Sequence, residues 1–383
     1  MSSRPLHGLS VVELGFGTAT GLAGRIMAGY GADVVKIESP EGDPSRRLGP
    51  FPPGAEGPET SAAFLHLHGG KSSVVLDLDD VGSRADLVTL LAGADVLLLD
   101  LRLPARPRLG LERTALRATY PRLVAISVTP FGESGPQAGW TGSALTEYAS
   151  GGQMSLMGER DREPLASYGN QAECQAALHV YSAALAGVLL RNRAGSGQYV
   201  EISVQEVEAS AMEAQGPVAY NHDPLSAAWT ARSGNGPRTV WSQYVCKDGY
   251  AGIFVNPPNL PGFFAGIGHP EWLSRATDEE FMNGELRQFV TAWCAQRTRQ
   301  EIFDAAIATG APFSYVATPA DLLGSEAVAR TGVWREVDHP VAGRFRVPGP
   351  PVRAEELEFE LRRAPLLGEH TDEVLRGVKG AST

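Results

Sequence analysis

Glu173 is the side chain in this sequence that is best placed to do chemistry. It stands three residues after Asn170, a good N-cap residue, at the start of a predicted helix that runs to about Arg191. The body of this helix is almost entirely Ala, Leu, Val and Tyr, so we expect a buried, rigid element. Free N–H groups and the helix dipole favour an anion in the first turn. Glu173 can therefore be a firmly held catalytic carboxylate, or it can simply complete a capping box.

A second candidate is the glycine-rich turn GFGTATG, which follows a predicted strand over residues 9–14 and opens a helix. Gly15 and Gly17, with Glu38 about twenty residues later, are typical of a dinucleotide-binding turn. That fingerprint also needs a Gly or Ala at position 20, where this chain has Thr20. The pattern therefore favours a tight crossover turn over a nicotinamide site.

Residues that could bind a metal are too few or too scattered. His66 and His68 stand close together, but no third ligand lies near them in the sequence. The three cysteines, Cys174, Cys246 and Cys294, are far apart and odd in number. We therefore expect neither a metal centre nor a disulfide framework.

Composition and charge exclude several functional classes. The 383-residue chain is 43% hydrophobic, which is enough for a large core and for two or three domains. Its net charge of −11 and its lack of a Lys/Arg run argue against general nucleic-acid binding. An anionic ligand would have to be bound by a few individual Lys or Arg side chains. Because no apolar signal core and no run of 18 apolar residues occurs, we expect a cytoplasmic protein without a membrane segment.

Predicted strands and helices alternate over residues 1–215 at the spacing of a mostly parallel α/β sheet. In such sheets, ligands gather at the carboxyl ends of the strands. Residues 216–238 have the composition of a linker. A hairpin that turns at 247–249, followed by several helices, predicts a small α+β domain over residues 239–330. The chain is then extended and rich in turn residues from 331, and it finishes in an amphipathic helix before residue 383.

Several motifs, in order along the chain, resemble those of one family. They are LHGLSVVEL, GADVVKIESPEGDPSR, GKSSVVLDL, RLGLE, LLRNRAGSGQYVEISVQE, KDGY, DHPVAGRF and APLLGEHTDEVL. The ordered set is similar to the class III coenzyme A transferases, which include formyl-CoA transferase, carnitine CoA-transferase and α-methylacyl-CoA racemase. The resemblance implies a Rossmann-like large domain built from residues 1–215 and 331–383, with the small domain between them. It also implies that two chains interlock as an obligate homodimer.

The resemblance assigns roles to individual residues. In family transferases an aspartate at the start of this helix attacks the acyl-CoA carbonyl, and its position falls on Glu173. The glutamate keeps the carboxylate but moves it by about 1 Å or more, and the same covalent route is open to it. Thr18 and nearby glycine N–H groups are expected to stabilise the oxyanion. The expected coenzyme A contacts are the retained polar residues Arg46, Lys71, Ser73 and Arg108.

We therefore expect an enzyme that moves coenzyme A between an acyl-CoA and a carboxylate through a glutamyl intermediate, without a metal. The His-Asp-Asn segment of the racemases would fall at residues 142–145 and is absent, so racemisation is not expected. Two alternatives stay open. One is a diverged family member in specialised biosynthesis, which catalyses a different reaction on an acyl or carboxylate ligand with Glu173 as a general base; the other is a non-catalytic dimeric binding protein.

Overall fold

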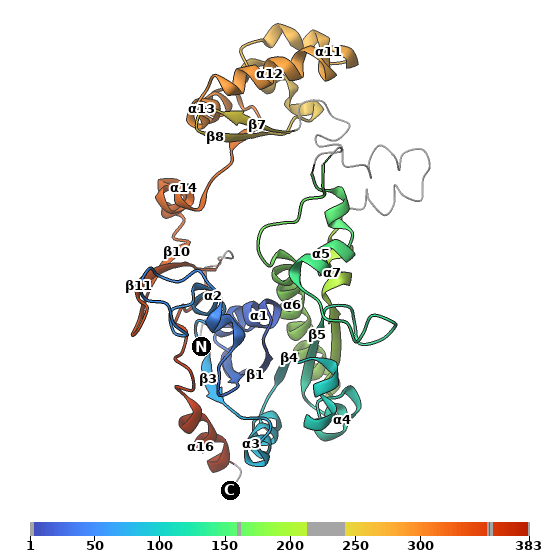
Figure 1. Cartoon of the computed structure of the whole chain (residues 1–383), viewed down its shortest axis with the longest axis vertical. Helices are drawn as coiled ribbons and strands as arrows, with labels where there is room; N and C mark the ends of the chain where they lie inside the picture. Colours follow the sequence, from blue (N-terminus) through green and yellow to red (C-terminus); the bar gives the residue numbers. More distant parts are fainter. Residues whose placement is uncertain (1–3, 159–161, 213–241, 351, 353–354, 382–383) are drawn as a thin grey trace. The chain divides into compact units, whose positions relative to one another are not determined.

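The computed structural model describes residues 4–158, 162–212, 242–350, 352 and 355–381. Contacts within the chain divide it into two compact units (Figure 1). The first unit comprises Met1–Gly152, Ser167–Ala211 and Arg330–Thr383, and the second comprises Gln153–Ala166 and Met212–Ala329. Residues 153–166, which we expected in the large domain, group with the second unit. The predicted linker over 216–238 lies outside the described residues.

The first unit contains a six-stranded parallel sheet in the order β3-β2-β1-β4-β5-β6. This is the strand order of a doubly wound, Rossmann-like fold, so the α/β prediction is confirmed. The strands are β1 Ser10–Gly15, β2 Asp33–Glu38, β3 Ser72–Val75, β4 Val96–Asp100, β5 Val124–Thr129 and β6 Tyr199–Ser203.

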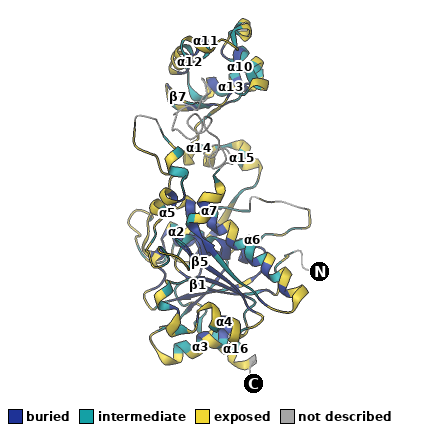
Figure 2. Cartoon of the chain, turned by 90° about the vertical axis from the view of Figure 1, so that its right-hand side faces the viewer, coloured by how far each residue is buried: buried dark blue, intermediate teal, exposed yellow. Residues whose placement is uncertain are grey.

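The central strands are apolar because helices cover both faces of the sheet. All six residues of β5 are buried, as are the first four of β4, and Figure 2 shows these strands in the buried colour. The helices of this unit are α1 Thr18–Gly29, α2 Ala62–Leu67, α3 Val81–Ala92, α4 Arg113–Thr119, α5 Ala144–Ser150, α6 Gln171–Ala194, α7 Val204–Ala211 and α16 Thr371–Ala381.

The C-terminal segment completes this first unit. It forms the two-stranded antiparallel sheet of β10 Trp334–His339 and β11 Gly343–Pro348, and then α16, which packs against α3 and β3. The backbone N–H of His370 donates to the carbonyl of Ser73 at 3.0 Å. Both ends of the chain therefore contribute to one folded unit.

The prediction that α6 is buried on all sides is wrong for the single chain. Its small residues Ala176, Ala184 and Gly187 face the unit, and a Cβ added at Gly187 would lie 2.5 Å from Val124 of β5. The opposite side is exposed, with Leu178 at 55% and Leu189 at 60% (Figure 2). Within the described part of the chain, α6 is long and apolar enough to cross a membrane by length and composition. One such helix is weak evidence for a membrane span, since the core helices of soluble proteins also meet this criterion.

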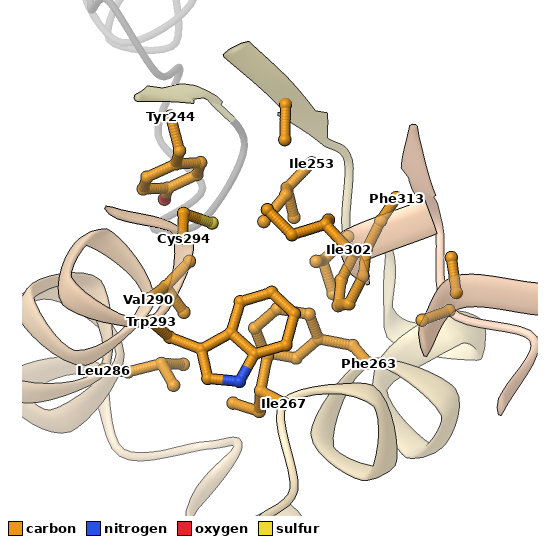
Figure 3. Packing of buried hydrophobic residues seen from close by; sticks show 14 of the residues in the cluster. Tyr244, Ile253, Phe263, Ile267, Leu286, Val290, Trp293, Cys294, Ile302 and Phe313 are labelled. Atoms are coloured by element: carbon orange, nitrogen blue, oxygen red, sulfur yellow. The ribbon is translucent and has the colours of Figure 1, made fainter. Parts of the chain in front are cut away.

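The second unit is built on a three-stranded antiparallel sheet in the order β7-β8-β9. Figure 3 shows side chains from its strands and helices converging in one apolar core. The elements are β7 Ser242–Cys246, β8 Gly249–Ile253, β9 Phe313–Tyr315, α10 Leu260–Gly266, α11 Glu279–Asn283, α12 Glu285–Ala295, α13 Arg299–Thr309, α14 Pro319–Gly324 and α15 Glu326–Arg330. Two of these helices, α11 and α12, follow each other directly and are separated at Gly284.

Candidate active site

The N-termini of α1 and α6 share the carboxylate of Glu173. This half-buried side chain stands in the first turn of α6, and its Oε2 accepts a 2.5 Å hydrogen bond from the backbone N–H of Thr18 in α1. Asn170 is the N-cap of α6, but its side chain makes no capping bond; its Nδ2 instead donates to Thr18 Oγ1 at 2.9 Å. The capping-box interpretation is therefore wrong. Glu173 is held by a different helix, which fixes its position relative to the sheet.

The glycine turn before α1 lets two carboxyl groups approach the start of that helix. A Cβ added at Gly17 would lie 2.1 Å from Oδ2 of Asp100 and 3.4 Å from Oε2 of Glu173. Because both distances start from the same point, the two carboxylate oxygens are at most about 5.5 Å apart. This close approach explains the glycine at position 17 without a dinucleotide.

Asp100 is a candidate functional residue that the sequence reasoning missed. It is the last residue of β4 and pairs with Gly15, the last residue of β1. Strand order reverses between β1 and β4, and open α/β sheets bind their ligands at the carboxyl ends of strands at such a point. Burial, followed by the charge of Glu173, raises the pKa of Asp100 to about 7. The signal in the sequence was a carboxylate directly after the apolar run of a central strand.

Glu147 of α5 adds a third carboxyl group to the same neighbourhood. It is buried, and its Oε2 has no hydrogen-bond partner among the residues that the structure describes. Burial raises its pKa to about 7, with further contributions from the charges of Glu173, Asp100 and Glu208. Three carboxyl groups that repel one another are therefore gathered around the predicted nucleophile, and near neutral pH some of them hold a proton.

Three of the four predicted coenzyme A contacts are instead part of the buried interior. Every N–H group of the Arg46 guanidinium donates a hydrogen bond to the protein. Glu38 accepts two of these bonds, at 2.7 and 2.8 Å, and Glu59 and two backbone carbonyls accept the others. Ser73 Oγ donates to Glu38 at 2.5 Å and accepts from the N–H of Gly368. Both side chains therefore stabilise the fold in this structure, and their role as coenzyme A contacts stays a prediction.

Lys71 is likewise a buried structural cation in this chain. Its Nζ contacts Oε2 of Glu13 at 2.6 Å, the carbonyl of Gly21 at 2.8 Å and Nδ1 of His68 at 3.0 Å. These three contacts use the three donors of an ammonium group. Burial lowers the pKa of Lys71 to about 8, although the charge of Glu13 opposes this shift. The structure therefore leaves no donor of Lys71 available to a phosphate.

Lys36 connects this buried network to the glycine turn. Its Nζ lies 2.7 Å from Asp43 and 3.3 Å from Glu13, and it donates to the carbonyl of Gly15. The charges of these carboxylates raise its pKa despite burial, so Lys36 stays protonated. The sequence reasoning did not single it out. It fixes the backbone that precedes Thr18.

Arg108 differs from the other predicted contacts, because its side chain is 56% exposed and pairs with the exposed Asp79. It can therefore reorient toward a ligand, and its coenzyme A role stays a prediction. Across the described residues, no group of three or more His, Cys, Asp or Glu is arranged to hold a metal ion.

Known proteins resemble the chain over almost its whole length. The model of CoA-transferase family III matches residues 6–371. The succinyl-CoA:(R)-benzylsuccinate CoA-transferase subunit BbsE of Thauera aromatica is 30% identical, covering 92% of this chain and 89% of that protein. Formyl-CoA:oxalate CoA-transferase of Streptomyces coelicolor is 26% identical, covering 99% of this chain and 96% of that protein. A CAIB/BAIF family protein from Brucella suis is 27% identical and has a TM-score of 0.85, covering 98% of this chain and 99% of that one. This chain belongs to CoA-transferase family III, as its ordered motifs predicted.

Proposed function

We propose that this protein is an acyl-CoA:carboxylate CoA-transferase in which Glu173 is the nucleophile. The family supports a general role in coenzyme A transfer. The observation that carries the proposal is the position of the Glu173 carboxylate at the N-termini of two helices, where Thr18 holds one oxygen at 2.5 Å. The other oxygen is left for attack on an acyl carbonyl.

The proposed reaction proceeds through two covalent states. Glu173 attacks the thioester carbon of the acyl-CoA, the C–S bond breaks and the CoA thiolate leaves, which gives a mixed anhydride. The thiolate then attacks the glutamyl carbonyl and expels the acyl group as a carboxylate, leaving a glutamyl–CoA thioester. An acceptor carboxylate takes the coenzyme A by the reverse of these steps, and Glu173 is regenerated.

Thr18 supports this route through its backbone N–H. In the resting structure this donor is occupied by Oε2 of Glu173. When a thiolate attacks the glutamyl carbonyl, negative charge develops on an oxygen of the same side chain. A donor already directed at this oxygen stabilises that charge without reorganisation. The oxyanion role expected for Thr18 is therefore proposed for the glutamyl carbonyl itself.

We further propose that the active form is a homodimer. The exposed side of α6 carries the apolar residues Leu178, Ala186 and Leu189 at helical spacing, with Ser182 between them, and we call this row the α6 stripe. Apolar stripes of this kind on a helix are covered by another element in a stable protein. A second copy of the chain would cover it, in agreement with the interlocked arrangement that the family resemblance implies.

The intact mass of the protein after incubation with a panel of acyl-CoAs, including succinyl-CoA and formyl-CoA, tests the proposed nucleophile. We expect a mass increase equal to coenzyme A less one water, located on Glu173 by peptide mapping and lost in Glu173→Gln. If Glu173 is a general base in another reaction, no adduct forms, while Glu173→Gln still lowers turnover by roughly 10²–10⁴-fold. The absence of an adduct with every acyl-CoA of the panel would overturn the nucleophile assignment.

A further inference from the structure

We propose that Asp100 is a further catalytic residue, which gives a proton to the coenzyme A sulfur when Glu173 is acylated and takes it back for the next step. This inference deepens the proposed function and rests on it, since both concern the same covalent reaction. The observation that supports it is that the carboxyl groups of Asp100 and Glu173 both bind the start of α1.

Two successive backbone N–H groups hold the two carboxyl groups side by side. Gly17 donates to Asp100 and Thr18 donates to Glu173. Asp100 reaches this position from the end of β4, where it pairs with Gly15, and Glu173 reaches it from the first turn of α6. Their oxygens are at most about 5.5 Å apart, and the glycine at position 17 leaves the space between them free of a side chain. An acyl-CoA sulfur bound at Glu173 therefore lies within reach of Asp100.

The charges that face Asp100 decide which carboxyl group carries a proton. Burial and the charge of Glu173 favour its neutral form, whereas the N–H of Gly17 and the cations Lys36 and Arg106 favour the ionised form. The balance raises the pKa of Asp100 to about 7. Near neutral pH a large share of the molecules therefore carries a protonated Asp100 beside Glu173, and this proton is what a general acid must supply.

Acylation of Glu173 changes this balance at the moment when an acid is needed. The attack removes the negative charge of Glu173 and creates a negative charge on the leaving sulfur. Without the charge of Glu173 the pKa of Asp100 falls, so its proton is released more readily. The proton moves from the Asp100 oxygen to sulfur, which gives neutral coenzyme A thiol and an Asp100 carboxylate. That carboxylate then recovers the proton as the thiol attacks the glutamyl carbonyl.

The test follows the formation of the glutamyl–CoA thioester from succinyl-CoA by quenched-flow mass spectrometry between pH 6 and 9. For the wild type we expect the rate to fall about tenfold per pH unit above about pH 7, because the acid must be protonated. In Asp100→Asn the rate at pH 6.5 should fall roughly 10²-fold or more, and the decline above pH 7 should disappear. Asp100→Ser offers the same test with a smaller side chain if the asparagine variant does not fold.

Glu147→Gln is the matched control, since it removes a neighbouring carboxyl group but leaves Asp100 in place. In this variant we expect the rate still to decline with rising pH. The decline should begin at a lower pH than in the wild type, because a like charge near Asp100 is lost. If the decline persists unchanged in Asp100→Asn or Asp100→Ser, Asp100 is not the acid, although the covalent route stands. The same conclusion follows if the decline disappears in Glu147→Gln. If the wild type forms no thioester with succinyl-CoA or with the rest of the acyl-CoA panel, the proposed function fails, and this inference fails with it.

Discussion

Oε2 of Glu173 accepts the backbone N–H of Thr18, although the two residues are 155 positions apart in the chain. This bond joins the helix that follows β1 to the helix that precedes β6, and the two helices also pack against each other. A carboxylate bound to the starts of two packed helices has little freedom to move.

The first prediction concerns the length and charge of this side chain. Glu173→Gln should fold normally, because its amide oxygen can still accept from Thr18, but it should form no adduct with acyl-CoA. Glu173→Asp withdraws the carboxylate by about 1 Å or more, so we expect thioester formation to slow by roughly 10²-fold. Intact mass and thermal unfolding check both variants. An aspartate variant that is faster than the wild type would show that the site is not adapted to glutamate.

The second prediction concerns the glycine that admits the two carboxyl groups. The methyl group of Gly17→Ala would lie 2.1 Å from Oδ2 of Asp100, so this carboxyl group must turn away from the start of α1. We expect adduct formation to fall about tenfold or more, with only a small loss of stability, since the end of a side chain gives way more easily than backbone. Gly139→Ala is the control, because an added Cβ there meets no atom within 4 Å. Equal activity of both variants would contradict the arrangement.

The sheet could be predicted well from the sequence, whereas part of the site could not. Near-continuous apolar runs, such as Val124–Thr129, identify buried parallel strands by themselves. Asp100 and Glu147 become functional candidates only when the fold brings them to Glu173; the local pattern marks Asp100 as a carboxylate at the end of an apolar strand but does not reveal its neighbours. The clearest missed signal was the presence of Glu13 and Lys36 in otherwise apolar strands, since buried charges require partners.

The same need for partners bears on the cations that were expected to contact coenzyme A. A lysine or arginine in a sequence looks like a possible phosphate ligand. Arg46 and Lys71 are instead the partners that the buried carboxylates of Glu38 and Glu13 need. Exposure separates such structural cations from ligand contacts, and exposure follows from tertiary packing. Family position alone therefore does not tell which cations are free to meet a phosphate.

The third prediction concerns the pH dependence of stability at Glu147. The folded protein raises the pKa of this carboxyl group to about 7, so between about pH 4.5 and 7 the folded state binds more protons than the unfolded state. Stability from this group is therefore complete below about pH 4 and is lost as the pH rises through 7. In Glu147→Gln the decline of the unfolding free energy from pH 5 to 8 should be smaller, by about 1 kcal/mol or more. Denaturant titrations of the wild type and of Glu147→Gln at both pH values measure this difference. An equal change of the unfolding free energy between pH 5 and 8 in the two proteins would contradict the prediction.

The fourth prediction concerns assembly through the α6 stripe. Leu178→Lys together with Leu189→Lys places two charges on the exposed apolar side of α6, where a second chain would have to bury them. We expect light scattering to show a dimer for the wild type, and a monomer or aggregated material for the double variant. Leu145→Lys changes an equally exposed leucine outside α6 and serves as the control. A wild-type chain that is a stable, folded monomer at micromolar concentration would exclude the proposed dimer.

The last prediction separates structural cations from a coenzyme A contact by comparing Lys71→Ala with Arg108→Ala. Removing Lys71 takes away a buried partner of Glu13 at 2.6 Å, which should lower the free energy of unfolding by about 3 kcal/mol or more. Its effect on coenzyme A binding by the folded protein should be small, because its ammonium group already has three protein partners. Thermal unfolding and calorimetric titration with coenzyme A measure the two effects separately.

Arg108→Ala should show the opposite behaviour. Its exposed ion pair with Asp79 contributes at most about 1 kcal/mol, so the unfolding free energy should hardly change. If Arg108 contacts a phosphate, the dissociation constant for coenzyme A should rise several-fold, and binding should depend less on salt because one ionic contact is lost. Should Lys71→Ala instead keep its stability and lose coenzyme A affinity, the ammonium group would be the phosphate ligand. Its contacts with Glu13 and His68 would then have to break when coenzyme A binds.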